Sequence, residues 1–331
     1  MSTSSTSSAM PPMREFNVSN SLLFDRQALD AAWERDGYWF FREVLDQGAL
    51  GRLRTVYMDT LKAAGVMDRD ATEPVYNGAS LEGLKVGVNT GRAEDVYADP
   101  LLARHPMKEF IAEPAIRAFF KKLIDDEPWW VPITEYHAAP PRVEHRANRF
   151  NFIHQDSSHN PGIPFRICWI PVAAIDDEIG GLALTEGLHK PRPDDFARPP
   201  EGIPQDVIPA DSWRRTNYRP GDLLMFDLNT PHSGIANHSN RYFRLSMDIR
   251  LLRASDNVPI VGTVACVDQI SITIAGNDGK NDRLLFEEDT YCRSYNGMRV
   301  PIEDIPKIVK IGDPVIVASE NGRARVIRPQ H

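Results

Sequence analysis

From Trp129 onward the chain is a series of short β-favouring runs separated by proline, glycine and asparagine, and this feature limits its fold most strongly. Each run can form one strand and each break one turn, which is typical of an all-β sandwich or jelly roll. We therefore expect a mainly β protein. Its expected strands are residues 131–136, 148–154, 165–172, 182–185, 223–226 and 244–252.

Two helical segments precede these runs. Residues 26–36 and 46–64 have helical composition and period. The second segment carries an apolar stripe suited to packing on a sheet, formed by Leu50, Leu53, Val56, Met58 and Leu61. Because the helices come before the strands, we expect them to buttress one outer face of the β core.

The expected domain covers residues 14–252, with its β core at about 129–252. Residues 1–13, rich in serine and threonine, are expected to be a disordered tail. Residues 191–209 carry many prolines and predict a loop or lid. Residues 253–331 contain further strand-like runs and are expected to pack on the same domain, in a role that the sequence does not identify. An oligomer contact and a wall of the active site are both open for them, and a homodimer through this extension is one expectation.

The segment 242–251 alternates cleanly between apolar and polar residues, which is the period of a half-buried strand. Its polar face carries Arg244, Ser246, Asp248 and Arg250. Arginine followed two residues later by serine places a guanidinium fork and a hydroxyl on one face, a pair that suits a carboxylate. A co-substrate such as 2-oxoglutarate, which chelates a metal at one end, needs such an anchor at the other.

Three residues form a candidate metal site. On an extended strand, His154 and Asp156 would project from the same face, and His232 follows the strand-like run 222–227. Two imidazoles and one carboxylate match the facial triad of a non-haem Fe(II) oxygenase. The alternative is that His154 and Asp156 form an ordinary hydrogen-bonded pair and His232 is a surface loop residue.

Four stretches together resemble the phytanoyl-CoA dioxygenase family of Fe(II)- and 2-oxoglutarate-dependent oxygenases. They are the Asp36-Gly37-Tyr38 passage within 33–45, the segment with His154 and Asp156, residues 180–190, and residues 232–250.

Two of these stretches depart from the family pattern. Glu186 and Leu188 stand where the family usually has proline and serine, so no catalytic role is carried onto His189. Arg244 lies one residue further from the distal histidine than is usual, which makes Arg241 a competitor. We prefer Arg244, because only it shares a strand face with Ser246.

The resemblance implies a double-stranded β-helix, a cupin-like jelly roll, with N-terminal helices. It implies Fe(II) held by His154, Asp156 and His232, with Arg244 and Ser246 holding 2-oxoglutarate as co-substrate and O2 as oxidant. The implied dioxygenase hydroxylates an unactivated C–H bond of a small molecule or natural-product intermediate, releasing succinate and CO2. Desaturation, ring closure and epimerisation use the same cofactors and stay open, whereas retention of Asp156 disfavours halogenation. A 2-oxoglutarate-independent cupin-type metalloenzyme and a non-catalytic ligand-binding jelly roll are the rival classes.

Composition excludes some partners and none of these activities. The net charge of −8 and pI near 5.6 argue against a nucleic-acid binder. No apolar stretch reaches the roughly eighteen residues of a membrane span. An odd number of cysteines without zinc-type spacing, Cys168, Cys266 and Cys292, indicates reduced thiols in a cytoplasmic protein.

Other residues near the ligand segment have weaker expected roles. Phe150, Phe152 and Trp169 could form aromatic walls, although aromatic residues in a β core more often serve packing. Gln155 is expected to support the ligands from behind. Residues that could touch the co-substrate or substrate are Thr134, Tyr136 and Arg166; those expected to be surface or supporting groups are His137, His145 and His159.

Overall fold

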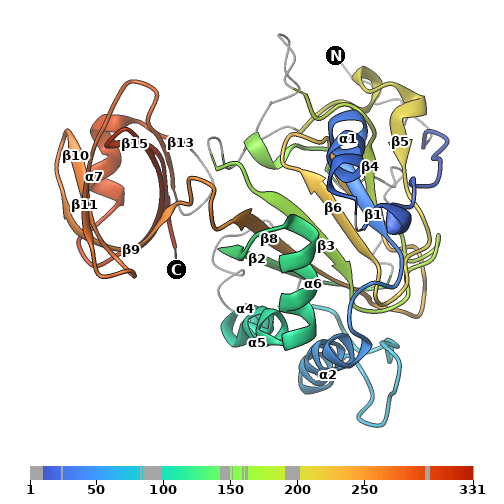
Figure 1. Cartoon of the computed structure of the whole chain (residues 1–331). Helices are drawn as coiled ribbons and strands as arrows, with labels where there is room; N and C mark the ends of the chain where they lie inside the picture. Colours follow the sequence, from blue (N-terminus) through green and yellow to red (C-terminus); the bar gives the residue numbers. More distant parts are fainter. Residues whose placement is uncertain are drawn as a thin grey trace, which may run out of the picture.

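The computed structural model describes residues 10–23, 25–82, 84, 99–141, 150, 152–158, 160, 163–190, 202–294 and 299–330. Figure 1 shows a β body covered by helices on one side and a separate, smaller β unit formed by the C-terminal part of the chain. Residues 1–9 of the expected tail and 191–201 of the expected loop lie outside the described residues. In the rest of that loop the described structure has one short 3-10 turn, η3 (Gln205–Val207).

The body contains two antiparallel sheets. The larger has the strand order β1-β6-β3-β8-β2 and the smaller β5-β4-β7, with every neighbouring pair antiparallel. This is the expected double-stranded β-helix, and the predicted mainly β fold is confirmed. The strands are β1 (Tyr38–Phe41), β2 (Pro128–Ala139), β3 (Arg166–Pro171), β4 (Gly181–Thr185), β5 (Trp213–Arg214), β6 (Leu223–Asp227), β7 (His232–Ile235) and β8 (Arg244–Arg253).

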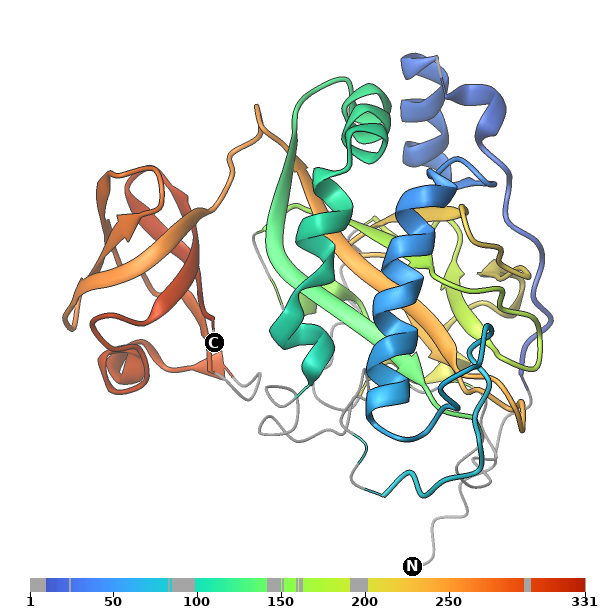
Figure 2. The same cartoon turned by 90° about the horizontal axis from the view of Figure 1, so that it is seen from below.

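Helices cover the outer face of the five-stranded sheet (Figures 1 and 2). The side chain of Asp46 caps α2 by accepting from the Ala49 N–H at 2.8 Å, and Leu50, Leu53 and Leu61 of its stripe are buried against the sheet. The predicted buttress is confirmed, although α4 to α6 were not expected. The helices are α1 (Arg26–Asp36), α2 (Gln47–Ala63), α4 (Pro100–Arg104), α5 (Pro106–Ala112), α6 (Pro114–Ile124) and α7 (Ile305–Ile308), with 3-10 turns η1 (Asn20–Leu22), η2 (Asp156–Ser158), η4 (Ala210–Ser212) and η5 (Ile302–Asp304). None of the described helices is long and apolar enough to cross a lipid bilayer.

The C-terminal part forms a seven-stranded sheet with the order β11-β10-β9-β14-β15-β12-β13. A further pairing of β11 with β15 closes five of these strands into a ring around a hydrophobic core of its own. A second set of its residues, Ile316, Ala318 and Val326, packs with residues of the body. The strands are β9 (Ile260–Val267), β10 (Ser271–Gly276), β11 (Asn281–Leu285), β12 (Tyr291–Arg293), β13 (Arg299–Val300), β14 (Pro314–Glu320) and β15 (Arg323–Pro329).

The expected strand at 148–154 is wrong for the residues that the structure describes there. Phe150 and His154 form only isolated bridges, with Ile235 and His232 respectively. The remaining positions that the structure describes, 152 and 153, are irregular, while 148, 149 and 151 lie outside the described residues. His232, in turn, begins strand β7 and does not lie in a loop.

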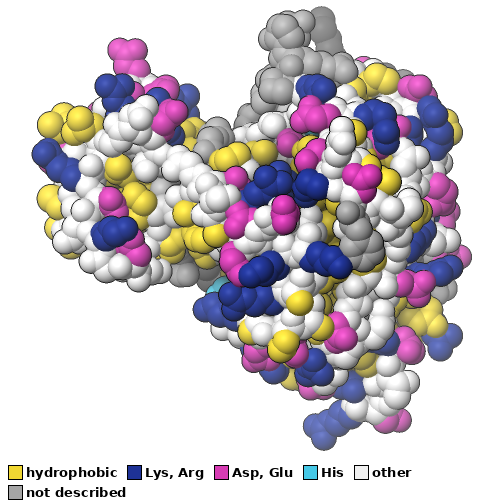
Figure 3. Space-filling view, viewed as in Figure 1, with side chains coloured by type: hydrophobic (Ala, Val, Ile, Leu, Met, Phe, Trp, Pro, Cys, Tyr) yellow, Lys and Arg dark blue, Asp and Glu magenta, His cyan; other side chains and the backbone are white. Residues whose placement is uncertain are grey.

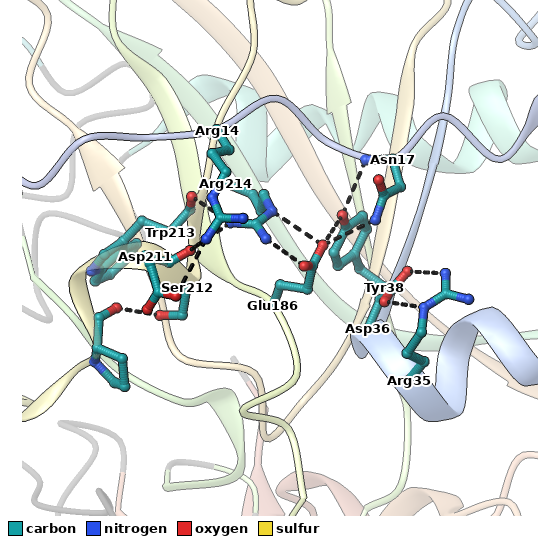
Figure 4. Close-up of polar contacts among 11 residues, drawn as sticks. Arg14, Asn17, Arg35, Asp36, Tyr38, Glu186, Asp211, Ser212, Trp213 and Arg214 are labelled. Atoms are coloured by element: carbon teal, nitrogen blue, oxygen red, sulfur yellow. Dashed lines mark hydrogen bonds and ion pairs between the residues drawn. The ribbon is translucent and has the colours of Figure 1, made fainter.

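Glu186, which stands where the family usually has proline, is the centre of a partly buried polar network (Figure 4). Its carboxylate accepts from the Tyr38 hydroxyl at 2.8 Å, the Asn17 amide at 3.1 Å and the Arg214 Nε at 3.1 Å. These partners come from β1, the N-terminal segment and β5. The unusual residue therefore ties three separate parts of the chain to the end of β4.

The described cysteines are all free, with Cys168 and Cys292 buried and Cys266 exposed. On the face shown in Figure 3, acidic and basic side chains are intermingled, so this face offers no extended surface of one sign.

Candidate active site

His154 and His232 are brought together by the backbone. The backbone N–H of His154 donates to the His232 carbonyl at 3.0 Å, and the backbone N–H of His232 donates to the His154 carbonyl at 2.9 Å. This two-way pairing places the imidazole centroids 4.3 Å apart. Two segments distant in the sequence thus meet at the edge of β7.

The two imidazoles have the same orientation. Nδ1 of His154 lies 3.2 Å from the Phe152 carbonyl, and Nδ1 of His232 lies 2.9 Å from the Thr230 carbonyl. A carbonyl can only accept, so Nδ1 carries a proton in each ring, and in the neutral form of the ring Nε2 keeps its lone pair. Both Nε2 atoms face the Asp156 carboxylate.

The three expected ligands converge. Asp156 Oδ1 lies 3.4 Å from His154 Nε2 and 3.8 Å from His232 Nε2, and one ligand atom from each residue lies within 4.8 Å of the others. The geometric reason given by the sequence was wrong, because Asp156 does not share a strand face with His154. It opens the 3-10 turn η2, and this turn brings the carboxylate back toward the imidazoles.

Electrostatics keep Asp156 and His232 in the forms that bind a divalent metal. Burial opposes the charged form of His154, but the Asp156 carboxylate raises the pKa of that imidazole, so a metal would displace a proton there. Burial alone would raise the pKa of Asp156, but Arg250 and the two histidines hold that pKa well below its usual range. Burial, followed by the nearby His154, lowers the pKa of His232 to about 4. An ionised carboxylate beside a neutral imidazole is the state that a metal ion requires.

Arg244 and Ser246 lie on β8 as expected, with Arg244 7% exposed and Ser246 fully buried. Arg244 Nη1 donates to the carbonyls of Gly181, at 3.2 Å, and Ile235. Arg244 Nε and Ser246 Oγ have no hydrogen-bond partner among the described residues. Two buried polar groups left unpaired in this way are what a site for a carboxylate ligand requires, so these residues fit 2-oxoglutarate.

Arg241, the competitor for this role, lies elsewhere. Its side chain is exposed and stacks over the Tyr242 ring at 5.3 Å. It does not share the buried inner face of β8.

His137, expected to be a surface or supporting group, is half-buried and lies between two carboxylates. Glu135 precedes it by two residues on β2, where Glu135 lies opposite Asp248 of β8 and His137 opposite Ser246. His137 Nε2 lies 3.0 Å from Asp248 Oδ2 and 3.7 Å from Glu135 Oε2, so these three residues form a second group able to hold a cation. The Glu135-x-His137 spacing was the signal that sequence reasoning missed.

The aromatic residues divide between the site and the core. Phe152 stacks on the His154 ring at 5.0 Å. Phe150 instead stacks on Trp213 at 4.5 Å, and Trp169 packs against Tyr218 at 4.6 Å. Phe152 is therefore the expected wall residue that lies against a metal ligand, and the packing role weighed for aromatic residues fits Phe150 and Trp169.

The polar neighbours divide similarly. Gln155 donates to the carbonyl of Asn229 and so supports the turn that leads into His232, as expected. Tyr136 accepts from the Met107 N–H at 3.1 Å, and Arg166 lies over the Trp33 ring at 5.3 Å, so both face the helices and not the site. The other two histidines, His145 and His159, lie outside the described residues.

The model of the phytanoyl-CoA dioxygenase (PhyH) family matches residues 33–246, a segment that includes all five expected site residues. The chain belongs to the phytanoyl-CoA dioxygenase family. It is an Fe(II)- and 2-oxoglutarate-dependent dioxygenase, and its His-Asp-His group is the arrangement expected for the iron of this PhyH enzyme.

Two curated relatives of this PhyH chain are 1-deoxypentalenic acid 11-beta-hydroxylases. The protein from Streptomyces exfoliatus is 28% identical over 254 residues and that from Streptomyces arenae 27%, each alignment covering 71% of this chain and 84% of the relative. Among solved structures, the epimerase SnoN in complex with Fe3+, alpha ketoglutarate and nogalamycin RO matches with a TM-score of 0.46 and 21% identity, covering 71% of this chain and 85% of that one. EctD from S. alaskensis with 2-oxoglutarate and 5-hydroxyectoine matches with a TM-score of 0.47 and 15% identity, covering 75% and 84%.

Proposed function

We propose that this enzyme hydroxylates an unactivated C–H bond of a small molecule, with iron held by His154, Asp156 and His232. The convergence of these three ligand atoms within 4.8 Å of one another carries the proposal. Iron held there would use O2 as the oxidant: one oxygen atom would enter the substrate as the hydroxyl, and the other would enter 2-oxoglutarate, which would leave as succinate and CO2. Hydroxylation is the default outcome, while desaturation, ring closure and epimerisation remain outcomes of the same site.

Arg244 and Ser246 hold the far carboxylate of 2-oxoglutarate. Arg244 contacts the Ile235 carbonyl, and Ile235 follows His232 by three residues on β7, which is about 10 Å along a strand. That separation is of the order that a five-carbon dicarboxylate chelating a metal at one end would bridge. The buried guanidinium offers its fork to the carboxylate, and the unpaired Ser246 hydroxyl can donate a further hydrogen bond.

The chain itself prepares the metal ligands. Arg250 Nη2 donates to Asp156 Oδ2 at 3.2 Å, which leaves Oδ1 directed at the two imidazoles. Phe152 covers one face of the His154 ring and excludes water from it. The ligand set is thus ordered by neighbouring residues before a metal binds.

The substrate is proposed to be a natural-product intermediate, with an acyl thioester as the second choice. Similarity to two hydroxylases named for 1-deoxypentalenic acid supports the first. Succinate release across a panel of small molecules would identify the substrate. No release with any panel member, while Fe(II) and 2-oxoglutarate bind, would limit the proposal to cofactor binding.

Anaerobic titration with Fe(II) and 2-oxoglutarate tests the cofactor roles. We expect the weak visible charge-transfer band of the metal–co-substrate complex, which a cupin-type enzyme without 2-oxoglutarate or a non-catalytic jelly roll would not give. Arg244→Ala should weaken 2-oxoglutarate binding, whereas Arg241→Ala, a matched exposed arginine, should not. An unchanged band in Arg244→Ala would remove the anchor role. The variants His154→Ala, Asp156→Ala and His232→Ala should fold and yet release no succinate, because each lacks one of three metal contacts.

The homodimer expected through residues 253–331 is retained as part of the proposal. Three large apolar side chains of this part are exposed, Ile270, Leu285 and Ile311, at 62%, 46% and 70%. Sedimentation of the wild-type chain and of Ile311→Asp would test it: a monomer in the wild type removes the homodimer.

A further inference from the structure

The C-terminal sheet packs onto the part of the body that carries the metal ligands. Ile316 and Ala318 of β14 and Val326 of β15 share one hydrophobic cluster with residues of the body, among them Val131, Ile133, Phe165 and Leu252. Phe165 also lies under Arg250, at 5.9 Å, and Arg250 contacts Asp156. The sheet lies beyond residue 246, where the family match ends.

Arg328 of β15 reaches from this sheet to the body. Its guanidinium donates to the side-chain oxygen of Asn160, a residue that is only 4% exposed. Asn160 in turn donates twice to the carbonyl of Asp156, from its backbone N–H at 3.0 Å and from its side-chain Nδ2 at 3.3 Å. The Asn160 amide is thus oriented by Arg328 at one end and fastens the turn η2 at the other.

The surroundings of Arg328 disfavour the charged form of its guanidinium. Burial, followed by the nearby Arg293 and Arg250, lowers its pKa to about 9, while Glu135 and Asp156 act in the opposite direction. Arg293, on β12, has its pKa lowered mainly by burial as well. Cations placed in such surroundings need specific partners, and for Arg328 that partner is Asn160.

We propose that Arg328 is a positioning residue for the metal centre: acting through Asn160, it fixes the turn that presents Asp156 to the two histidines. The C-terminal sheet is therefore a working part of this active site and not an independent appendage. The inference rests on the proposed role of Asp156 as a metal ligand.

The test measures Co(II) binding to the metal-free protein by the visible absorption of bound cobalt, without 2-oxoglutarate. Arg328→Ala and Asn160→Ala should each weaken Co(II) binding by about tenfold, the lower end of what loss of a supporting partner costs a metal site. The double variant should be no weaker than the weaker single variant, because both changes break one chain of contacts. Arg325→Ala is the matched control, since Arg325 is on the same strand and its ion-pair partners among the described residues are Glu320, Glu287 and Asp289 of the C-terminal part. It should bind Co(II) as the wild type does.

The unfolding midpoints of the metal-free proteins separate positioning from simple docking. An unchanged Co(II) affinity of Arg328→Ala overturns the inference, whether or not its unfolding midpoint falls. Losses of Co(II) affinity that add up in the double variant overturn it as well. Should Arg328→Ala fail to fold, Arg328→Gln gives the same comparison, with weaker Co(II) binding expected and unchanged binding decisive against it. Asp156→Ala tells the two proposals apart. If it binds Co(II) like the wild type, the metal site itself is misassigned; if it loses Co(II) while Arg328→Ala does not, only the present inference fails.

Discussion

Arg250 contacts the Asp156 oxygen that faces away from the histidines: Nη2 lies 3.2 Å from Oδ2, while Oδ1 faces the two imidazoles. The same guanidinium lies 3.0 Å from Glu135 Oε1 and so joins the metal group to the polar group around His137. Asp156 can thereby offer one oxygen to a metal while the other is held by the fold.

Replacing Arg250 should weaken metal binding in a pH-dependent way. Without Arg250, burial would raise the pKa of Asp156, and protons would then compete with the metal in weak acid. We expect Arg250→Ala to bind Co(II) about 10- to 100-fold more weakly. The loss should be larger at about pH 6 than at about pH 8, because a metal ligand must be deprotonated. Arg250→Lys, which keeps the charge, should lose less; an equal loss at both pH values would contradict the charge argument.

His137 should stabilise the fold in a pH-dependent way. Burial opposes its charged form, but the Asp248 carboxylate at 3.0 Å outweighs burial and raises its pKa. A raised pKa in the folded state means that the stabilisation is complete below the unfolded value of about 6.5 and is lost as pH rises through the folded pKa.

The corresponding measurement is urea unfolding of the metal-free wild type and His137→Gln across that pH range. We expect His137→Gln to lose about 1–3 kcal/mol in weak acid, with the difference shrinking as pH increases. Asp248→Asn should show the same trend, because it removes the other half of the pair. A difference that does not change with pH would mean that His137 is held as a neutral group.

Glu186 should contribute strongly to stability, although it stands where the family usually has another residue. Glu186→Ala would leave Arg214, which is 6% exposed, without its carboxylate partner. Removing one member of a fully buried ion pair costs about 3–5 kcal/mol, and because the Glu186 side chain is 21% exposed we expect a loss at the lower end of that range. Glu34→Ala is the control, because Glu34 and its partner Lys190 are both exposed and should contribute no more than about 1 kcal/mol. Similar urea midpoints for the two variants would show that the Glu186 network is not a buried one in solution.

Two glycines should respond to alanine with opposite signs. Gly37 ends α1 with φ at 79°, and a Cβ there would lie 2.4 Å from His189 Nδ1, so Gly37→Ala should destabilise the protein by more than the roughly 1–2 kcal/mol of the left-handed backbone alone. Gly51 lies within α2 with nothing within 4 Å of such a Cβ. Gly51→Ala should therefore stabilise by about 0.5–1 kcal/mol. Equilibrium unfolding of both variants checks the signs, and a loss in Gly37→Ala no larger than the backbone cost of about 1–2 kcal/mol would mean that the His189 ring moves aside freely.

Local sequence patterns predicted those elements whose own residues determine them. The helix predicted at 26–36 agrees with α1, and the helix predicted at 46–64 agrees with α2 and its Asp46 cap. Both predictions succeed because a helix cap and an apolar period depend on residues close together in the sequence. The alternation at 242–251 likewise predicted β8, including which residues share its polar face. The convergence of His154, Asp156 and His232 was anticipated from the resemblance to the family, because these residues alone left an ordinary hydrogen-bonded pair open.

What the sequence did not predict depends on contacts between distant segments. Whether His137 faces solvent or contacts Asp248 depends on the pairing of β2 with β8, which no local pattern reveals. The segment before His154 has the composition of a strand, yet its backbone pairs only at single positions, with Ile235 and His232. The ring closure of the C-terminal sheet requires β11 to meet β15, and the contact of Arg328 with Asn160 requires that sheet to be in place first.

The shared orientation of the two imidazoles influences which divalent metal ion the protein binds. Both rings have Nδ1 committed to a backbone carbonyl, so the nitrogen atoms available to a metal are already fixed before it arrives. A site of fixed nitrogen and oxygen donors binds divalent ions in the order of their intrinsic affinity. Nickel, copper and zinc bind such donors more tightly than ferrous iron does. Preparations exposed to a nickel resin should therefore retain nickel and be inactive until a chelator removes it and ferrous iron is restored. In the cell, the fraction of the protein that holds iron then depends on a low concentration of free nickel, copper and zinc.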